Sequence, residues 1–178
     1  MHVDIDGDRF ELYVKHELIE RVIYDLAVKM EKELADKKPV FIVVLNGAFM
    51  FAADLMRHFE FECEIDFIRM GSYEGRERRE KVDTILGLNR EIKGRTVVII
   101  EDIVDTGNTL NTLLKEFREK EPKEIFTATF LYKPMAHDHK DNVDWWALRI
   151  PNDFVLGYGL DYKGKGRNLR DIYKFVEQ

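Results

Sequence analysis

Hydrophobic residues recur at three- and four-residue spacing over residues 17 to 34, and this spacing predicts an amphipathic helix. The residues on its apolar face are Leu18, Val22, Ile23, Leu26, Met30 and Leu34. A short apolar run over residues 40 to 45 is followed by Asn46-Gly47 and then by helical spacing over residues 48 to 59. That order predicts a strand, a tight turn and a second helix.

Strands and helices alternate along the rest of the chain. Apolar and β-branched runs predict strands over residues 64 to 70, 96 to 100, 124 to 132, 145 to 150 and 154 to 160. Residues 110 to 119 have helical spacing. We therefore expect an α/β fold, with a mainly parallel sheet flanked by helices on both faces, and ligands at the carboxyl ends of its strands. Because no linker-like stretch divides the chain, residues 1 to 178 are expected to form one domain.

Composition narrows the class of protein. The chain is 45% hydrophobic and 12% aromatic, which supports a sizeable core. Its net charge of −6 argues against broad attachment to nucleic acid. The apolar runs are too short to span a membrane, and the acidic first residues lack a signal region. The single cysteine, Cys63, excludes an internal disulfide, so we expect a cytoplasmic protein.

The segment TVVIIEDIVDTGNTL carries the strongest functional signal. A buried strand is followed by three acids, Glu101, Asp102 and Asp105, and then by the turn Thr106-Gly107-Asn108-Thr109 at a helix start. Backbone N–H groups freed by that turn, at the positive end of the helix, would form a cradle for a phosphate monoester. The spacing differs from that of a P-loop, and ATP is a poor candidate ligand.

The acids beside the cradle suit a ribose phosphate, since Glu101 and Asp102 could accept hydrogen bonds from sugar hydroxyls or hold hydrated Mg²⁺. A simpler interpretation exists for each residue. Asp105 or Thr106 could merely cap the helix, and Glu101 and Asp102 could be solvated strand-end charges. That simpler interpretation is preferred for any one acid alone, whereas the combination of all three acids with the cradle is specific.

The segment EDIVDTGNTL resembles the phosphoribosyl-pyrophosphate signature of type I phosphoribosyltransferases, and the chain resembles the hypoxanthine-guanine phosphoribosyltransferases, with residues 1 to 39 matching less specifically. Between Val40 and Tyr173 the family's motifs occur in order, as VVLNGAFMFAADL, DFIRMGSYEG, EDIVDTGNTL and IPNDFVLGYGLDYKGKGRNLRDIY. The resemblance implies the type I fold with a small hood region. It also implies Mg²⁺-dependent transfer of 5-phosphoribosyl to N9 of hypoxanthine, guanine or xanthine, and a homodimer or homotetramer.

The resemblance assigns roles to the residues after the central strand. Asp105 matches the acid near purine N7, which is the candidate general base. Glu101 and Asp102 match the acids that hold the ribose hydroxyls. The 5-phosphate loop corresponds to Thr106, Gly107, Asn108 and Thr109. Many relatives have a lysine at the position of Asn108, and a cradle of backbone N–H groups should tolerate the difference.

Purine contacts are implied for four further residues. Lys133 matches the lysine that donates to the 6-oxo group, a contact that selects against adenine. Phe154 matches the aromatic that stacks on the purine, the backbone of Val155 matches a partner of the base edge, and Asp161 matches a Mg²⁺ ligand near the base. Taken alone, Lys133 would be interpreted as a snorkelling surface lysine, Phe154 as a core residue and Asp161 as a turn aspartate.

The remaining implied roles concern pyrophosphate and the lid. Asn46 and Gly47 match the loop that often contains a cis peptide, and which of its two peptides is cis stays open. Arg167 matches the arginine that clamps pyrophosphate. Ser72 and Tyr73 match the tip of a closing lid. Some relatives have a lysine at the position of Asn46, which leaves its contacts open.

Other segments and functions fit the sequence less well. His137-Asp138-His139 lacks further metal ligands at recognisable spacing and is interpreted as a surface turn. An RNA-binding regulator on the same fold is a second function hypothesis, disfavoured by the net acidity. A receiver-like phosphoacceptor at Asp102 is a third.

Overall fold

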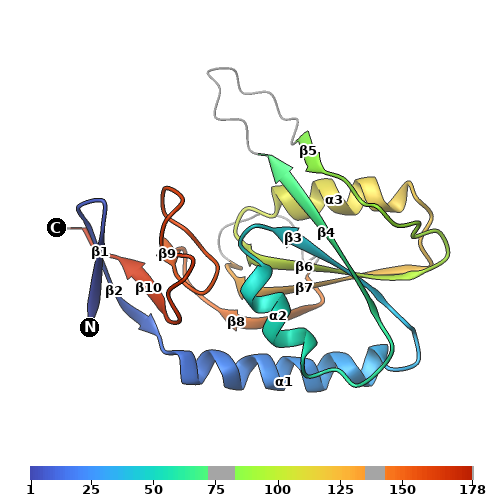
Figure 1. Cartoon of the computed structure of the whole chain (residues 1–178), viewed down its shortest axis with the longest axis horizontal. Coiled ribbons are helices and arrows are strands. Elements are labelled where there is room, and N and C mark those ends of the chain that lie inside the picture. The colour runs from blue at the N-terminus through green and yellow to red at the C-terminus, as the bar shows by residue number, and fades with distance from the viewer. Residues whose placement is uncertain (72–82, 135–142, 178) are drawn as a thin grey trace.

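The structure, a computed structural model, describes residues 1 to 71, 83 to 134 and 143 to 177, and its largest feature is a six-stranded sheet (Figure 1). In spatial order its strands are β5 (Asp83–Leu86), β4 (Glu64–Gly71), β3 (Val40–Leu45), β6 (Thr96–Val104), β7 (Glu124–Tyr132) and β8 (Trp145–Arg149). All but the edge strand β5 run parallel to their neighbours. The predicted parallel sheet is confirmed, and the predicted strand over residues 124 to 132 matches β7 at both ends.

Helices cover both faces of this sheet. α1 (His16–Leu34) and α2 (Phe49–Met56) pack on one face, and α3 (Asn108–Arg118) packs on the other. The central strands β3 and β6 are almost wholly buried because neighbouring residues contribute alternately to the two resulting cores. Within the described residues, no helix is long and apolar enough to cross a membrane.

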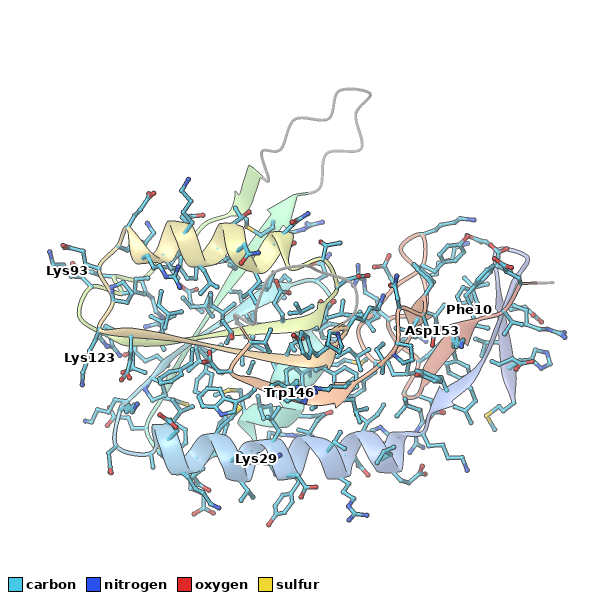
Figure 2. All side chains as sticks on the ribbon, turned by 180° about the vertical axis from the view of Figure 1, so that it is seen from behind. Phe10, Lys29, Lys93, Lys123, Trp146 and Asp153 are labelled. Carbon is cyan, nitrogen blue, oxygen red and sulfur yellow. The ribbon has the colours of Figure 1, made fainter. Side chains whose placement is uncertain are left out.

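A smaller antiparallel sheet lies beyond one end of the large sheet. It contains β1 (His2–Ile5), β2 (Asp8–Val14), β10 (Ile172–Phe175) and β9 (Val155–Leu156), in that spatial order. Phe10 is fully buried between its aromatic neighbours Tyr162 and Phe175. Figure 2 shows Phe10 and Asp153 in this lobe, with Lys93 and Lys123 at the opposite end of the molecule. This lobe corresponds to the expected hood.

One predicted strand is wrong. Residues 154 to 160 contain only the two-residue strand β9, because the chain then turns sharply. Gly157, Tyr158 and Gly159 all have positive φ angles, of 103°, 48° and 98°. A backbone in the left-handed region cannot continue a β-strand. Val155, Leu156, Tyr158 and Leu160 are nevertheless buried, which is why the stretch resembles a strand in the sequence.

Candidate active site

Two acids lie inside β6. The strand continues to Val104, four residues beyond its predicted end, so that Glu101 and Asp102 belong to the sheet. Glu101 is only 6% exposed, and Asp102 is half-buried. Their interpretation as solvated charges is therefore wrong. Continuous pairing with β7, in which Glu101 lies opposite Thr129, extends the strand past its apolar run.

The acids share a cavity of about 270 Å³ with the turn that follows them. Its lining runs from Glu101 to Leu110, and so contains the whole expected cradle from Thr106 to Thr109. Gly107 precedes α3 with a φ of 75°, a left-handed conformation that glycine adopts without steric penalty. The N–H groups of the first helical turn lack intrahelical acceptors, and the helix dipole adds partial positive charge there. The loop can therefore bind an anion.

Helix capping does not account for Asp105. Its Oδ2 accepts a hydrogen bond from Nζ of Lys133 at 2.8 Å. Thr106 accepts the N–H of Asn108 only at 3.5 Å, a long and weak cap. Lys133 is 5% exposed, so its interpretation as a snorkelling surface lysine is wrong. Asp105 is about half exposed, and the ion pair leaves part of its carboxylate open to a ligand.

A second cavity, of about 290 Å³, adjoins the first. It is lined by residues from four segments, namely Val44, Leu45, Asn46, Gly47, Met70, Glu101, Asp102, Thr109, Asp161 and Arg167. The sequence-predicted pyrophosphate residues therefore lie together with the acid pair. The peptide between Leu45 and Asn46 is cis, which answers the question that the sequence left open. Gly47 lies so close to Asp102 that a Cβ atom on it would be 1.4 Å from Oδ2.

Two contacts hold the guanidinium of Arg167 at the wall of this second cavity. Its Nη2 lies 2.6 Å from Oδ1 of Asp161, and its Nη1 donates to the carbonyl of Gly159 at 2.8 Å. Asp161 also accepts the N–H of Gly164, so it is a turn aspartate and the partner of an arginine at once. The arginine is a planar cation held at the cavity wall, an arrangement suited to phosphate oxygens.

Burial disfavours the ionised form of both acids. Burial raises the pKa of Asp102 to about 6, against the lowering effects of the Ile103 N–H and of Arg167. Burial and the neighbouring Asp102 charge raise the pKa of Glu101 well above its usual range. Two carboxylates held in this way would gain from a ligand that brings positive charge or hydroxyl donors.

The carboxylates of this site suit a partly hydrated Mg²⁺ ion better than a metal ion that is held by protein ligands alone. Among the described residues, no group of three His, Cys, Asp or Glu side chains is placed to hold a metal ion. Mg²⁺, however, is usually bound by one or two carboxylates, with waters and substrate phosphates completing its shell. Asp102 and Asp161, which line the same cavity, are oxygen ligands of that type.

Phe154 and Val155, two of the expected base-contacting residues, line neither cavity, whereas Asp161 lines the second. Phe154 is 50% exposed, so its interpretation as a core residue is wrong. Its ring lies at the edge of the small sheet, 5.6 Å from the ring of Tyr162. Val155 is buried in β9. The expected lid residues Ser72 and Tyr73, and the set-aside segment 137 to 139, fall outside the described residues.

Sequence reasoning missed the contact between Gly159 and Gly47. A Cβ atom on Gly159 would lie 2.2 Å from the Gly47 carbonyl oxygen, so these two loops touch through their backbones. The only available signal was the Gly-Tyr-Gly pattern, which by itself indicates a turn.

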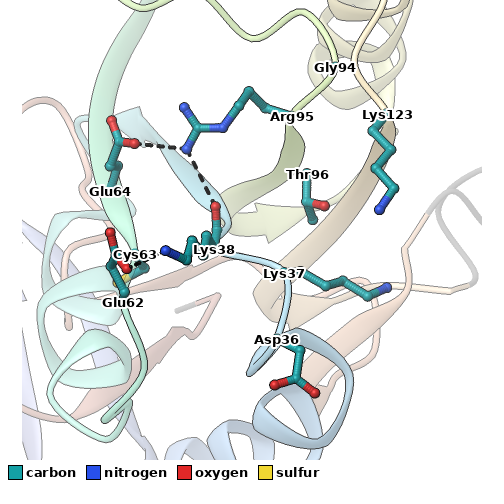
Figure 3. A pocket seen from close by; sticks show the side chains of 10 residues that line it. All are labelled: Asp36, Lys37, Lys38, Glu62, Cys63, Glu64, Gly94, Arg95, Thr96 and Lys123. Atoms are coloured by element: carbon teal, nitrogen blue, oxygen red, sulfur yellow. Dashed lines mark hydrogen bonds and ion pairs between the residues drawn. The ribbon is translucent and has the colours of Figure 1, made fainter.

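A larger cavity, of about 410 Å³, lies at the opposite end of the large sheet, where Glu64 and Thr96 begin their strands. Figure 3 shows its charged side chains, several of which are paired with one another. Arg95 contacts Glu64 at 2.7 Å, and Lys38 contacts Glu62 at 2.8 Å. This mutual neutralisation, at the amino ends of the strands, distinguishes it from the acid-lined site at the carboxyl ends.

Comparison with known proteins agrees with this geometry. The family model "phosphoribosyl transferase domain" matches residues 11 to 163. A hypoxanthine-guanine phosphoribosyltransferase of Streptococcus pneumoniae is 37% identical over 98% of this chain and 97% of its own length. Its counterpart from Aquifex aeolicus is 33% identical over 96% and 97%.

A solved structure supports the same assignment. The crystal structure of a hypoxanthine-guanine phosphoribosyltransferase from Bacillus anthracis superposes with a TM-score of 0.87 at 34% identity, covering 93% of this chain and 98% of the other. The α/β architecture is therefore that of the type I phosphoribosyltransferases. The chain belongs to the phosphoribosyltransferase family, and its relatives place it among the hypoxanthine-guanine phosphoribosyltransferases.

Proposed function

We propose that this enzyme transfers 5-phosphoribosyl from phosphoribosyl pyrophosphate to N9 of hypoxanthine or guanine, with xanthine as a further candidate, giving a purine nucleoside monophosphate and pyrophosphate. The observation that carries the proposal is that two cavities share Glu101 and Asp102 in their linings. The first cavity contains the backbone N–H groups of the phosphate cradle, and the second contains Arg167. A ribose that bridges them would have one phosphate group at each end.

The ribose would be held between these ends. Its 5-phosphate would accept hydrogen bonds from the backbone N–H groups of residues 106 to 109. Its 2- and 3-hydroxyls would donate hydrogen bonds to Glu101 and Asp102. Fixing both ends of the sugar holds C1 in line for displacement, and this orientation supplies much of the rate enhancement. A developing positive charge at C1 would also be stabilised by the two nearby carboxylates.

The purine would enter beside Asp105 and Lys133. Lys133 offers only donors, so it would bind the 6-oxo group and reject the 6-amino group of adenine. Asp105, at hydrogen-bond distance from Lys133, would hold the purine proton at N7 as general base. Phe154 is exposed and aromatic, and so could stack on the base, while the Val155 backbone would meet its edge.

The pyrophosphate would leave through the second cavity. Arg167 and the backbone at Asn46 and Gly47 would stabilise its negative charge. Glu101, Asp102 and Asp161 are the carboxylates that would hold Mg²⁺, whose charge would further stabilise the leaving group. Ser72 and Tyr73 are proposed to form the lid that excludes water.

We also propose the domain organisation, oligomeric state and location that the family resemblance implies. Residues 1 to 178 would form one domain of a cytoplasmic homodimer or homotetramer that binds no nucleic acid and no membrane.

The test is an assay of four bases, hypoxanthine, guanine, xanthine and adenine, with phosphoribosyl pyrophosphate and Mg²⁺. The change in purine absorbance measures turnover. We expect turnover of hypoxanthine or guanine, and none of adenine. An absence of turnover with every 6-oxopurine would overturn the proposal. In that event, salt-dependent binding of RNA would favour the regulator hypothesis, which none of the relatives above supports.

A further inference from the structure

A tyrosine in the turn after β9 links two loops of the active site. Tyr158 has a φ of 48°, a left-handed conformation that is costly for a residue with a side chain, and it is flanked by Gly157 and Gly159 in the same region. Such a conformation persists only where surrounding contacts fix it. The tyrosine is 3% exposed, and its ring packs 5.0 Å from the ring of Phe130.

The hydroxyl of Tyr158 supplies the polar contact. It donates a hydrogen bond to Oδ2 of Asp54, which lies on α2, 104 residues earlier in the sequence. Burial and the hydrogen bond to Asp54 both raise the pKa of the phenol, so the hydroxyl remains a donor throughout the neutral range. Asp54 also accepts Nη2 of Arg57 through its other oxygen, at 2.6 Å.

Each end of this hydrogen bond belongs to an element of the active site. α2 begins at Phe49, two residues after Gly47, so Asp54 is fixed to the helix that follows the pyrophosphate loop. On the other side, Gly159 follows Tyr158 directly and holds Arg167 twice. Its carbonyl accepts Nη1 of Arg167 at 2.8 Å, and its N–H donates to the Arg167 carbonyl at 2.9 Å.

We propose that Tyr158 and Asp54 are positioning residues that set the separation of Gly47 and Arg167, and with it the affinity for the pyrophosphate group of the substrate. The proposal rests on the proposed function, since it concerns the same cavity. Neither side chain lines that cavity. Both act through backbone, because the turn at Gly159 touches the Gly47 carbonyl and carries the acceptor for Arg167.

The test compares four variants of the whole chain, namely Tyr158→Phe, Asp54→Ala, Asp54→Asn and Arg57→Ala. Tyr158→Phe keeps the buried ring and removes the hydroxyl. Asp54→Asn keeps an acceptor for that hydroxyl, whereas Asp54→Ala removes it. Arg57→Ala is the matched control, because it removes the exposed ion pair of Asp54 and leaves the tyrosine contact in place.

We expect Tyr158→Phe and Asp54→Ala each to raise KM for phosphoribosyl pyrophosphate about tenfold, as loss of one hydrogen bond to a carboxylate permits. KM for hypoxanthine should change less than about twofold, and the double variant Tyr158→Phe/Asp54→Ala should be no worse than either single variant. Asp54→Asn and Arg57→Ala should remain close to the unsubstituted enzyme.

Several results would overturn this inference. One is an unchanged KM for phosphoribosyl pyrophosphate in both Tyr158→Phe and Asp54→Ala. Another is an equal rise in KM for both substrates together with a lower melting temperature, which indicates a merely structural role. A third is the same defect in Asp54→Asn as in Asp54→Ala. Calorimetric titration with pyrophosphate and Mg²⁺ separates the two proposals, because a weaker complex in Tyr158→Phe supports the positioning role even if no purine is turned over.

Discussion

The buried ammonium of Lys133 lies 2.8 Å from the carboxylate of Asp105, and this ion pair joins the end of β7 to the loop that precedes α3. The family resemblance implies separate tasks for the two residues, one toward the 6-oxo group and one toward N7. Those two atoms of a 6-oxopurine are neighbours on one edge of its ring system. A lysine and an aspartate in mutual contact therefore form a matched donor and acceptor for that edge.

Substitution of Asp105 by Asn tests its role as general base. Asn keeps an oxygen that can accept from Lys133, but it cannot take up a proton near N7. We expect kcat to fall about 10²- to 10⁴-fold, the usual contribution of a positioned acid or base, with KM for phosphoribosyl pyrophosphate changed little. Steady-state kinetics measure both. Asp25→Asn, at an exposed position of α1, is the control, and an unchanged kcat in Asp105→Asn would remove this residue from catalysis.

Replacement of Lys133 by Met tests purine recognition. Met has a similar length and no donor, so the 6-oxo group would lose a charge-assisted hydrogen bond. We expect kcat/KM for hypoxanthine to fall about 10- to 100-fold. The affinity for phosphoribosyl pyrophosphate, measured by calorimetry, should be nearly intact. Lys123→Met removes an exposed lysine at the opposite end of the sheet and should change neither quantity. Equal losses for both substrates in Lys133→Met would contradict the assignment.

The sequence predicted the large sheet well and the small one poorly, for a physical reason. Strand β3 and the first part of β6 are buried on both faces, so their continuous apolar residues are visible in any window of the sequence. In the hairpin of β1 and β2 only Phe10 and Val14 are buried, and the third strand, β10, pairs with β2 from almost the other end of the chain. No pattern within a short stretch of sequence can show that β10 pairs with β2.

The same distinction applies to the site. The cradle and its acids are contiguous in sequence, and their arrangement could be predicted from one segment. The burial of Lys133 and of Tyr158 could not, because each depends on a partner from a distant segment: Asp105 in one case and Asp54 in the other. Residues whose role depends on tertiary contact resemble ordinary surface or turn residues when they are viewed alone.

Asp102→Asn should stabilise the protein while weakening substrate binding. Burial raises the pKa of Asp102 from 3.8 to about 6, so the folded protein binds this proton more tightly than the unfolded chain does. Stability therefore falls as pH rises from about 4 to 6, and the loss persists at higher pH. The shift corresponds to an upper bound of about 3 kcal/mol. Asn also removes the charge that helps to raise the pKa of Glu101.

We therefore expect Asp102→Asn to melt at a higher temperature than the unsubstituted enzyme at pH 7.5, and the difference to shrink toward pH 4. Thermal melts across that range measure it, with Asp25→Asn as the exposed control. The affinity for phosphoribosyl pyrophosphate should fall in the same variant, since a ribose acceptor is lost. A lower melting temperature at pH 7.5 would contradict the argument that this carboxylate is costly to bury.

Gly47→Ala tests the close approach of the pyrophosphate loop to the acid pair. An added Cβ would lie 1.4 Å from Oδ2 of Asp102, so the loop or the strand must move. Overpacking of this kind costs about 1 to 3 kcal/mol of stability. Because Asp102 and the loop line one cavity, we expect the affinity for pyrophosphate to fall about 10-fold or more, as measured by calorimetry with Mg²⁺.

Gly87→Ala is the matched control, since an added Cβ there meets no atom within 4 Å and the backbone is not left-handed. If Gly47→Ala bound pyrophosphate as tightly as Gly87→Ala, the loop could not be the binding element that its contact with Asp102 indicates.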